Sequence, residues 1–417
     1  MRDGFALPLR ERGTSTTARA VTPLDRWLGR QLQDTLAPRG IRVRLWDGST
    51  PWADGSPLGE LTVHDRGALA GLIVTPEWSF GEMYMQGRVL VHDSLPRVVQ
   101  ALNRLSRPGP PSLAERILLA VAPANDRLRA RRNIYHHYDL GNDFYRLWLD
   151  RDLVYTCACY PSPHATLEEA QRAKLDMVCR KLALRPGERV VEAGCGWGAL
   201  ALHMAKHYGV TVRAFNISRD QIAHARERAA AEGLSSRVEF IEDDYRTITG
   251  RFDAFVSVGM LEHVGRRQFR ALAAVLARSI EPDTGRGLLH FIGRDHPRRL
   301  NTWIRRRIFP GAYPPTLDEV LNGVLQPANL SVLDVENLRL HYARTLTDWR
   351  TRYEQAEATV RERFGDAFAR AWHLYLTGSE AAFMTGWLQL FQVVFAPAAG
   401  TVVHHLRPSH PCAPAMY

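Results

Sequence analysis

The chain has 417 residues, a formal net charge of +10 and a pI near 9.6, and 45% of its residues are hydrophobic. This length allows two or three domains, and the apolar fraction is ordinary for a soluble globular protein. No apolar run approaches the roughly 18 residues that a transmembrane helix needs, and the N-terminus lacks the hydrophobic region of a signal peptide. We therefore expect a cytoplasmic protein whose positive charge favours an anionic partner, either nucleic acid or anionic lipid.

The cysteines do not indicate a metal site. Cys157 and Cys159 are too close together for a usual zinc knuckle, and no second Cys/His pair with suitable spacing accompanies them. We therefore expect no bound metal.

The first quarter of the chain predicts a small α+β domain behind a disordered tail. Residues 1–22 are polar and show no hydrophobic periodicity, which is typical of disorder. The elements expected over 23–105 are an amphipathic helix with Leu24, Trp27, Leu28 and Leu32, strands Ile41–Leu45 and Leu61–Val63, and a helix over Leu95–Leu105. Residues 106–124 begin with Ser-Arg-Pro-Gly-Pro-Pro-Ser and are expected to form a linker, because prolines and glycine interrupt regular elements.

Residues 125–403 predict a larger α/β domain, followed by a loose tail over 404–417. The expected elements are strand 190–193, helix 199–208, strand 211–216, helix 219–232, and strands 238–242, 252–258 and 287–292. Such alternation predicts a doubly wound, mostly parallel sheet that binds its ligand at the carboxyl ends of the strands. Late strands near 331–335 and 391–395 would add an antiparallel hairpin.

The turn after the first of these strands, Glu-Ala-Gly-Cys-Gly-Trp-Gly over 192–198, is the most informative motif. Its glycines let the backbone approach a ligand, and the helix that follows offers unpaired N–H groups. Glu192 supplies a carboxylate where a nucleoside-methionine ligand needs one, whereas a phosphate site would want a later glycine or a Lys-Ser/Thr pair. We interpret the turn as a binding site for S-adenosylmethionine (SAM) that includes Gly194, Cys195 and Gly196.

The ends of the next two strands agree with SAM better than with a dinucleotide. The second strand ends at Asn216, where a dehydrogenase would carry an acidic residue for the ribose. The third strand ends at Asp243-Asp244-Tyr245, where methyltransferases hold the adenine amine and cover its ring. Asp244 could instead be a helix N-cap.

Several motifs together resemble one family. They are Tyr138-Asp-Leu-Gly-Asn-Asp143, Tyr155-Thr-Cys-Ala158, Glu192–Gly198, Ser257-Val-Gly-Met-Leu-Glu-His-Val-Gly265 and His290-Phe-Ile-Gly293. In this order they resemble the cyclopropane-fatty-acyl-phospholipid synthase family, which is related to the mycolic acid cyclopropane synthases. The resemblance is strong over 125–396 and weaker in the N-terminal region, through Gly81–Gly87. It implies a Rossmann-like SAM-dependent methyltransferase sheet with a small N-terminal domain that touches lipid.

The resemblance also implies an activity, the transfer of a methylene group from SAM to the cis double bond of an unsaturated phospholipid acyl chain. The alkene attack leaves a carbocation, and in this family bound bicarbonate removes the proton that allows ring closure. The matching catalytic residues are Cys157, Glu262, His290, the Ile292 backbone and Tyr342, with Glu262 able to orient His290. The residues that match the SAM site are Tyr155, Thr156, Glu192, Gly194, Cys195, Gly196, Asn216, Gln221, Asp244 and Tyr245.

Other interpretations remain open. Cys157 could be a small buried hydrophobe, His290 a satisfied core histidine, and Glu262 a helix cap. The second functional hypothesis is a SAM-dependent fatty-acyl methyltransferase that makes a methyl- or methylene-branched chain. A lipid-binding module would not need Glu262, His290 and Tyr342 together, and we find no RNA-binding motif. We therefore expect no nucleic-acid partner. The resemblance implies peripheral contact with the inner face of the membrane and, because members of the family often dimerise, a homodimer.

Overall fold

The structure is a computed structural model that describes residues 20–51, 56–104 and 140–401. The predicted tail over 1–22 is described only from residue 20, and the predicted linker over 106–124 and tail over 404–417 lie outside these residues. The chain divides into two compact units, one of Met1–Arg107, Asn301–Ile308 and Tyr353–Thr385, the other of Pro108–Leu300, Phe309–Arg352 and Gly386–Tyr417.

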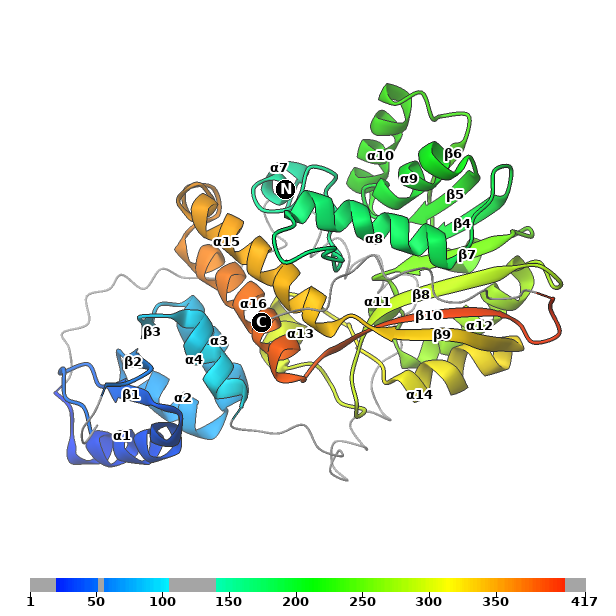
Figure 1. Cartoon of the computed structure of the whole chain (residues 1–417). Coiled ribbons are helices and arrows are strands. Elements are labelled where there is room, and N and C mark those ends of the chain that lie inside the picture. The colour runs from blue at the N-terminus through cyan, green and yellow to red at the C-terminus, as the bar shows by residue number, and fades with distance from the viewer. Residues whose placement is uncertain (1–19, 52–55, 105–139, 402–417) are drawn as a thin grey trace. The chain divides into compact units, whose positions relative to one another are not determined.

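The N-terminal part of the first unit is a three-stranded sheet with helices (Figure 1). Its elements are α1 (Pro23–Leu36), β1 (Ile41–Arg44), β2 (Gly59–Val63), α2 (Arg66–Val74), α3 (Pro76–Met85), β3 (Val89–His92) and α4 (Leu95–Asn103). β2 lies between β1, to which it is parallel, and β3, to which it is antiparallel. The predictions of α1, β1, β2 and α4 are confirmed. The sequence interpretation did not include α2, α3 or β3.

Helix α1 buries only part of its apolar stripe. Leu32 and Leu36 are buried, whereas Leu24 and Trp27 are 56% and 55% exposed. The helix begins at a capping box formed by Thr22 and Asp25, in which each residue bonds to the backbone of the other. The first turn therefore presents two large apolar side chains on its surface.

Two segments from late in the chain belong to the first unit. α16 (Asp366–Thr385) packs on α3 and α4, and α13 (Thr302–Arg307) packs on α3. The indole of Trp303 lies so close to Gly81 that a Cβ there would be 2.5 Å from the ring. Domain boundaries expected from the linear sequence do not include these segments, because tertiary packing alone brings them to the N-terminal helices.

The second unit is built on a seven-stranded sheet of order β6-β5-β4-β7-β8-β10-β9. The strands are β4 (Arg189–Ala193), β5 (Thr211–Asn216), β6 (Val238–Glu242), β7 (Ala254–Val258), β8 (Arg286–Gly293), β9 (Leu330–Asn337) and β10 (Gln389–Pro397). The first five are parallel, and β10 runs antiparallel to both β8 and β9. The predicted doubly wound methyltransferase sheet is confirmed. The late strands pair as expected, but two long helices separate them in sequence, so they do not form a hairpin.

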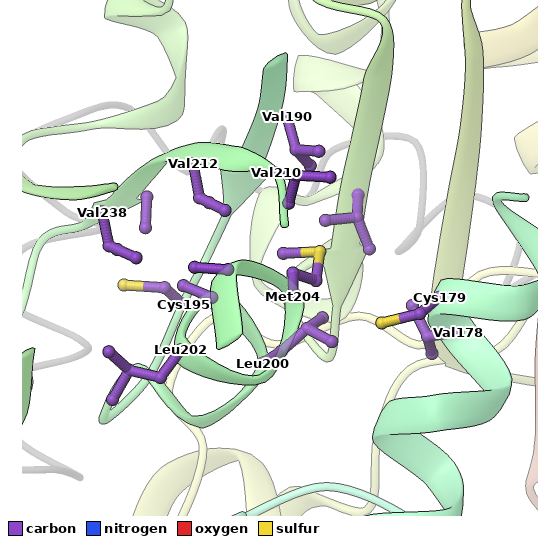
Figure 2. Close-up of a cluster of buried hydrophobic side chains, with 14 of the residues drawn as sticks. Val178, Cys179, Val190, Cys195, Leu200, Leu202, Met204, Val210, Val212 and Val238 are labelled. Atoms are coloured by element: carbon purple, nitrogen blue, oxygen red, sulfur yellow. The ribbon is translucent and has the colours of Figure 1, made fainter. Parts of the chain in front are cut away.

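Helices cover both faces of this sheet. The helices of this unit are α7 (Asn142–Arg146), α8 (Leu167–Lys181), α9 (Ala199–Tyr208), α10 (Arg219–Ala231), α11 (Leu261–Val264), α12 (Phe269–Ser279), α14 (Leu317–Val320) and the first part of α15 (Arg339–Phe364), and α8, α9, α10 and α12 pack on the sheet. Residues of α8, α9 and α10 form one buried cluster with alternate residues of the strands, and Figure 2 shows Leu200 and Met204 of α9 close to Val190 and Val212. A second cluster packs α12 on the opposite face. None of the described helices has both the length and the apolar character that a membrane span requires.

Candidate functional site

A cavity lies at the carboxyl ends of the parallel strands, where a doubly wound sheet places its ligand. All ten residues predicted for the SAM site line it, namely Tyr155, Thr156, Glu192, Gly194, Cys195, Gly196, Asn216, Gln221, Asp244 and Tyr245. They come from four separate segments of the chain. The fold therefore brings together residues that the sequence could associate only through their motifs.

The glycine turn has the backbone conformation that glycine favours. Gly194 and Gly196 have φ angles of 87° and 53°. A Cβ on Gly194 would lie 2.9 Å from the Cβ of Met260, whereas one on Gly196 would meet no atom within 4 Å. Gly194 is thus required by close packing and Gly196 by its φ angle beside the cavity.

The two residues predicted at the ribose are joined to each other. Asn216 Nδ2 donates to Gln221 Oε1 at 2.7 Å, and Asn216 Oδ1 accepts from the N–H of Ile217 at 2.8 Å. Gln221 is buried in the first turn of α10, which is capped by Ser218. The pair is therefore held in place from the end of β5.

Asp244 is an N-cap, as the alternative interpretation held, and it also lines the cavity, while its role at the adenine stays a prediction. Its carboxylate accepts from the N–H of Arg246 at 2.9 Å, as an N-cap of the short 3-10 helix Tyr245–Thr247, and it also lines the cavity. Arg246 forms an ion pair with Asp244 at 3.2 Å, and its guanidinium lies 5.0 Å from the centre of the Tyr245 ring. Arg246 lines the cavity as well, and the sequence interpretation had not included it.

Aromatic side chains surround Tyr155. Its ring centre is 5.1 Å from that of Trp148 and 5.3 Å from that of Trp349, and Trp349 is in edge contact with Tyr342 at 5.9 Å. Trp197, in the glycine turn, donates its indole N–H to Asn142 Oδ1 at 2.7 Å. The wall beside the methionine end of the predicted SAM site is therefore largely apolar.

Lys174 is a cavity residue that the sequence interpretation did not include. It is 2% exposed, lines the cavity, and donates from Nζ to Thr156 Oγ1 at 2.8 Å. Burial lowers the pKa of Lys174 to about 8, and burial raises the pKa of Glu192 to about 8, against the opposing effect of Lys174. One sequence feature could have located Lys174 on a helix. The capping box Thr166-x-x-Glu169 marks the start of α8, and Lys174 lies two turns after that start.

The cavity residues fit SAM. Glu192 Oε2 is buried without a hydrogen-bond partner, so the site holds an acceptor that a ligand amino group can satisfy. The open space at Gly196 lets a ligand approach the backbone. Glu192, Thr156 and the glycine turn would hold the methionine part, Asn216 and Gln221 the ribose, and Asp244 and Tyr245 the adenine.

The five predicted catalytic residues do not line this cavity. Their chain neighbours Thr156 and His263 do. The backbone carbonyl of Leu338 accepts two hydrogen bonds, one from the backbone N–H of Tyr342 at 3.1 Å and one from the Cys157 thiol at 4.0 Å. Burial raises the pKa of the Cys157 thiol, which keeps it protonated. Cys157 is thus a buried side chain, as the alternative interpretation expected. It also shares the carbonyl of Leu338 with the backbone N–H of Tyr342.

Glu262 is bound to the backbone of β8 rather than to His290. Its Oε1 accepts from the Ile292 N–H at 2.6 Å, and its Oε2 is buried without a partner. Burial raises the pKa of Glu262 to about 7. Glu262 lies inside α11, so the helix-cap interpretation is wrong, and so is the expectation that Glu262 orients His290. The Ile292 N–H is already engaged by Glu262.

His290 is oriented by a residue that was not predicted to act on it. Its Nδ1 lies 2.9 Å from Gln392 Nε2, on the neighbouring strand β10, and its Nε2 is buried without a partner. The interpretation as a fully satisfied core histidine is therefore wrong. Burial, with Lys174 and Lys181 nearby, holds the pKa of His290 well below its usual range, so the ring is neutral.

Comparisons with known proteins agree with this geometry. Residues 125–393 match the model of the mycolic acid cyclopropane synthetase family. The chain is 33% identical to a probable fatty acid methyltransferase of Pseudomonas putida, over 85% of this chain and 91% of that protein. It is 34% identical to a tuberculostearic acid methyltransferase of Mycobacterium tuberculosis, over 91% and 97%. It is 39% identical to the cyclopropane-fatty-acyl-phospholipid synthase of Escherichia coli, over 62% and 66%.

A solved structure supports the same assignment. A cyclopropane synthase of Mycobacterium tuberculosis superposes with a TM-score of 0.61 at 29% identity, over 64% of this chain and 98% of that one. A more distant neighbour, a coclaurine N-methyltransferase at 20% identity and a TM-score of 0.63, shares the fold. The chain therefore belongs to the mycolic acid cyclopropane synthetase family and is a SAM-dependent methyltransferase.

Proposed function

We propose that this enzyme transfers a methylene group from SAM to the cis double bond of an unsaturated phospholipid acyl chain and closes a cyclopropane ring. The observation that carries the proposal is two buried polar atoms without a hydrogen-bond partner, Glu262 Oε2 and His290 Nε2. His290 lies on β8, and Glu262 binds the N–H of Ile292 two residues further along the same strand. A buried unsatisfied polar atom is costly, so these two atoms support a site for a small polar ligand.

SAM, when bound, supplies an electrophilic methyl group. An alkene is a weak nucleophile, so the protein must hold it aligned with that methyl group and exclude water. The ring of Tyr155 suits this task, because it lines the cavity and is backed by the buried rings of Trp148 and Trp349, so the wall that it forms is apolar. Ring closure then needs the added carbon to lose a proton, whose C–H bonding pair forms the third side of the ring.

Bicarbonate, when bound, supplies the acceptor for that proton. The residues present fit a small oxyanion: His290 Nε2 can donate, and Glu262 can accept from the hydroxyl of the ion. The protonated Cys157 thiol bonds to Ala158 O at 3.1 Å, so it would donate to the ion only by turning away from that carbonyl. The backbone N–H of Tyr342 and the Cys157 thiol both bond to Leu338 O, which brings the start of α15 to Cys157. Ile292 acts indirectly in this arrangement, because its N–H holds Glu262 in position.

A second candidate function is the formation of a methyl- or methylene-branched acyl chain. The relatives named as fatty acid methyltransferase and tuberculostearic acid methyltransferase match 85% and 91% of this chain, including its N-terminal region. The same cavity and the same catalytic residues would serve this reaction. The products differ in the fate of the carbocation. Loss of a chain proton gives a methyl-branched alkene, and a hydride shift followed by loss of a proton from the added carbon gives a methylene branch, so the position of the proton acceptor matters. A saturated methyl branch needs in addition a hydride donor as a two-electron reductant.

The test supplies oleoyl phospholipid and SAM whose methyl group carries carbon-13 and three deuteriums. A cyclopropane product keeps two deuteriums, and its labelled carbon gives a ring signal in carbon-13 NMR. A labelled carbon that keeps three deuteriums indicates a methyl branch, and a labelled alkene carbon indicates a methylene branch. Either branched product as the main one would overturn the proposal in favour of the second candidate.

We further propose that the enzyme acts as a homodimer on anionic lipid at the inner face of the membrane. The net charge of +10 and the exposed Leu24 and Trp27, which alternate with exposed Arg26 and Arg30 on α1, support binding to an anionic surface. The arginines of α13 should contribute less to membrane binding than their number suggests, because two of them have partners within the protein. Arg307 binds Glu82 at 2.6 Å, and Arg306 lies over the ring of Trp78. Analytical ultracentrifugation tests the dimer, and a monomer at micromolar concentration would contradict it.

A further inference from the structure

The contact between His290 and Gln392 follows from the register of the sheet. Gln392 on β10 lies directly opposite His290 on β8 in the antiparallel pairing, so both side chains project from the same face. Gln392 is completely buried and His290 is 2% exposed. Their hydrogen bond at 2.9 Å therefore forms where water cannot replace it.

This bond decides which ring nitrogen carries the proton. A neutral imidazole has one N–H and one acceptor nitrogen, and a hydrogen bond at one nitrogen selects the tautomer. The amide N–H of Gln392 donates to Nδ1, so the proton of the neutral ring stands on Nε2. Nε2 of His290 has no hydrogen-bond partner in the structure, so its N–H is available to donate to a bound ligand.

We propose that Gln392 is a positioning residue that fixes His290 in the tautomer protonated at Nε2 and thereby supplies the donor for the oxyanion. The inference rests on the proposed function for the identity of that anion, but the effect on the tautomer does not depend on it. Replacing a residue that holds a metal-ligating histidine by its other nitrogen commonly costs about 10- to 100-fold in affinity or activity, and we expect an effect of the same order here.

The surroundings explain why an amide suits this position. On its other side Gln392 is opposite Glu336 of β9, which is bound by Lys181 Nζ, and Lys174 acts on His290 from the same helix. Burial, and after it these two cations, lowers the pKa of His290 and keeps the imidazole neutral. A glutamate at position 392 would instead accept a hydrogen bond from Nδ1, which favours the inverted tautomer or a charged ring.

The decisive readout is the tautomer itself, measured by long-range proton–nitrogen NMR on protein labelled with nitrogen-15 in the histidine rings. His290→Asn identifies the His290 signals by their disappearance. We expect the parent enzyme to be protonated at Nε2, Gln392→Glu to be protonated at Nδ1, and Gln392→Met, which keeps the volume, to show a mixture. Gln389→Glu is the matched control, because Gln389 lies on the same strand but bonds to Asn337 and Asp295.

A second readout is the bicarbonate concentration that gives half-maximal turnover in buffer depleted of carbon dioxide. We expect it to rise about 10- to 100-fold in both Gln392 variants, with SAM affinity unchanged and Gln389→Glu like the parent. A parent protonated at Nδ1, or an unchanged tautomer in both Gln392 variants, would overturn the inference. Turnover that does not depend on bicarbonate would overturn the proposed function, and the tautomer measurement would still decide the role of Gln392.

Discussion

Replacing the buried Lys174 by methionine should weaken SAM binding without weakening the fold. Lys174 is 2% exposed, and its charge lies in the interior beside Thr156 and the cavity. Methionine has a similar length and no charge, so the variant removes the ammonium group but keeps the packing. We expect opposite effects on SAM binding and on stability. The buried charge of Lys174 is unfavourable to the folded state, so its removal should not destabilise the protein, whereas its hydrogen bond to Thr156 orders the binding site, so the loss of that bond should weaken SAM binding.

The size of the stability effect follows from the pKa of Lys174. Burial lowers it from 10.5 to about 8, and at 1.36 kcal/mol per pKa unit this corresponds to about 3 kcal/mol of destabilisation at neutral pH. Losing the hydrogen bond to Thr156 offsets about 1 kcal/mol of the gain. The apo variant should therefore unfold at a temperature equal to that of the parent or a few degrees higher.

The pH dependence has a definite sign. The folded pKa lies below the unfolded value, so the unfavourable charge is fully present below about pH 8 and disappears as the pH rises from about 8 to 10.5. The difference in unfolding temperature between Lys174→Met and the parent should shrink over the same range. Differential scanning fluorimetry across this range measures it.

Lys181→Met is the matched control on the same helix. Lys181 is ion-paired with Glu336, and with Asp334 at 3.6 Å, so its loss removes the counter-charge of buried carboxylates and should cost about 3–5 kcal/mol. We expect SAM affinity, measured by calorimetry, to fall about 2- to 10-fold in Lys174→Met and to stay unchanged in Lys181→Met. If Lys174→Met unfolds as early as Lys181→Met and binds SAM like the parent, Lys174 is only structural and the reasoning is wrong.

Three further predictions concern the proton acceptor, the glycine turn and the membrane. Glu262→Gln should lower turnover about 10²- to 10⁴-fold while SAM affinity is kept, and near-full activity with lost SAM binding would contradict the assignment. Gly194→Ala should reduce SAM affinity and stability more than Gly187→Ala, because both have φ near 87° but only the first places a Cβ against Met260; equal effects would refute the close contact. Co-sedimentation with vesicles should rise with anionic lipid, fall with salt and weaken in Trp27→Ser, whereas equal binding to neutral vesicles at high salt would argue against the membrane proposal.

The sequence by itself determined the parallel part of the sheet and the SAM site. Apolar periodicity and the glycine turn are local properties, so β4, α9, β5 and α10 could be predicted from neighbouring residues. Parallel strands gather their carboxyl ends at one edge, and the residues that follow them, such as Asn216 and Asp244, therefore meet in one cavity without further information.

Only the tertiary structure decided the partners of the catalytic residues. His290 and Gln392 are 102 residues apart, and their contact depends on the register of β10, which reaches the sheet after two long helices. A shift of one residue would turn Gln392 to the opposite face. Glu262 likewise binds a backbone N–H on β8, and Lys174 reaches Glu192 because α8 packs on the sheet. Such contacts are set by register and packing between distant segments, which local sequence patterns do not encode.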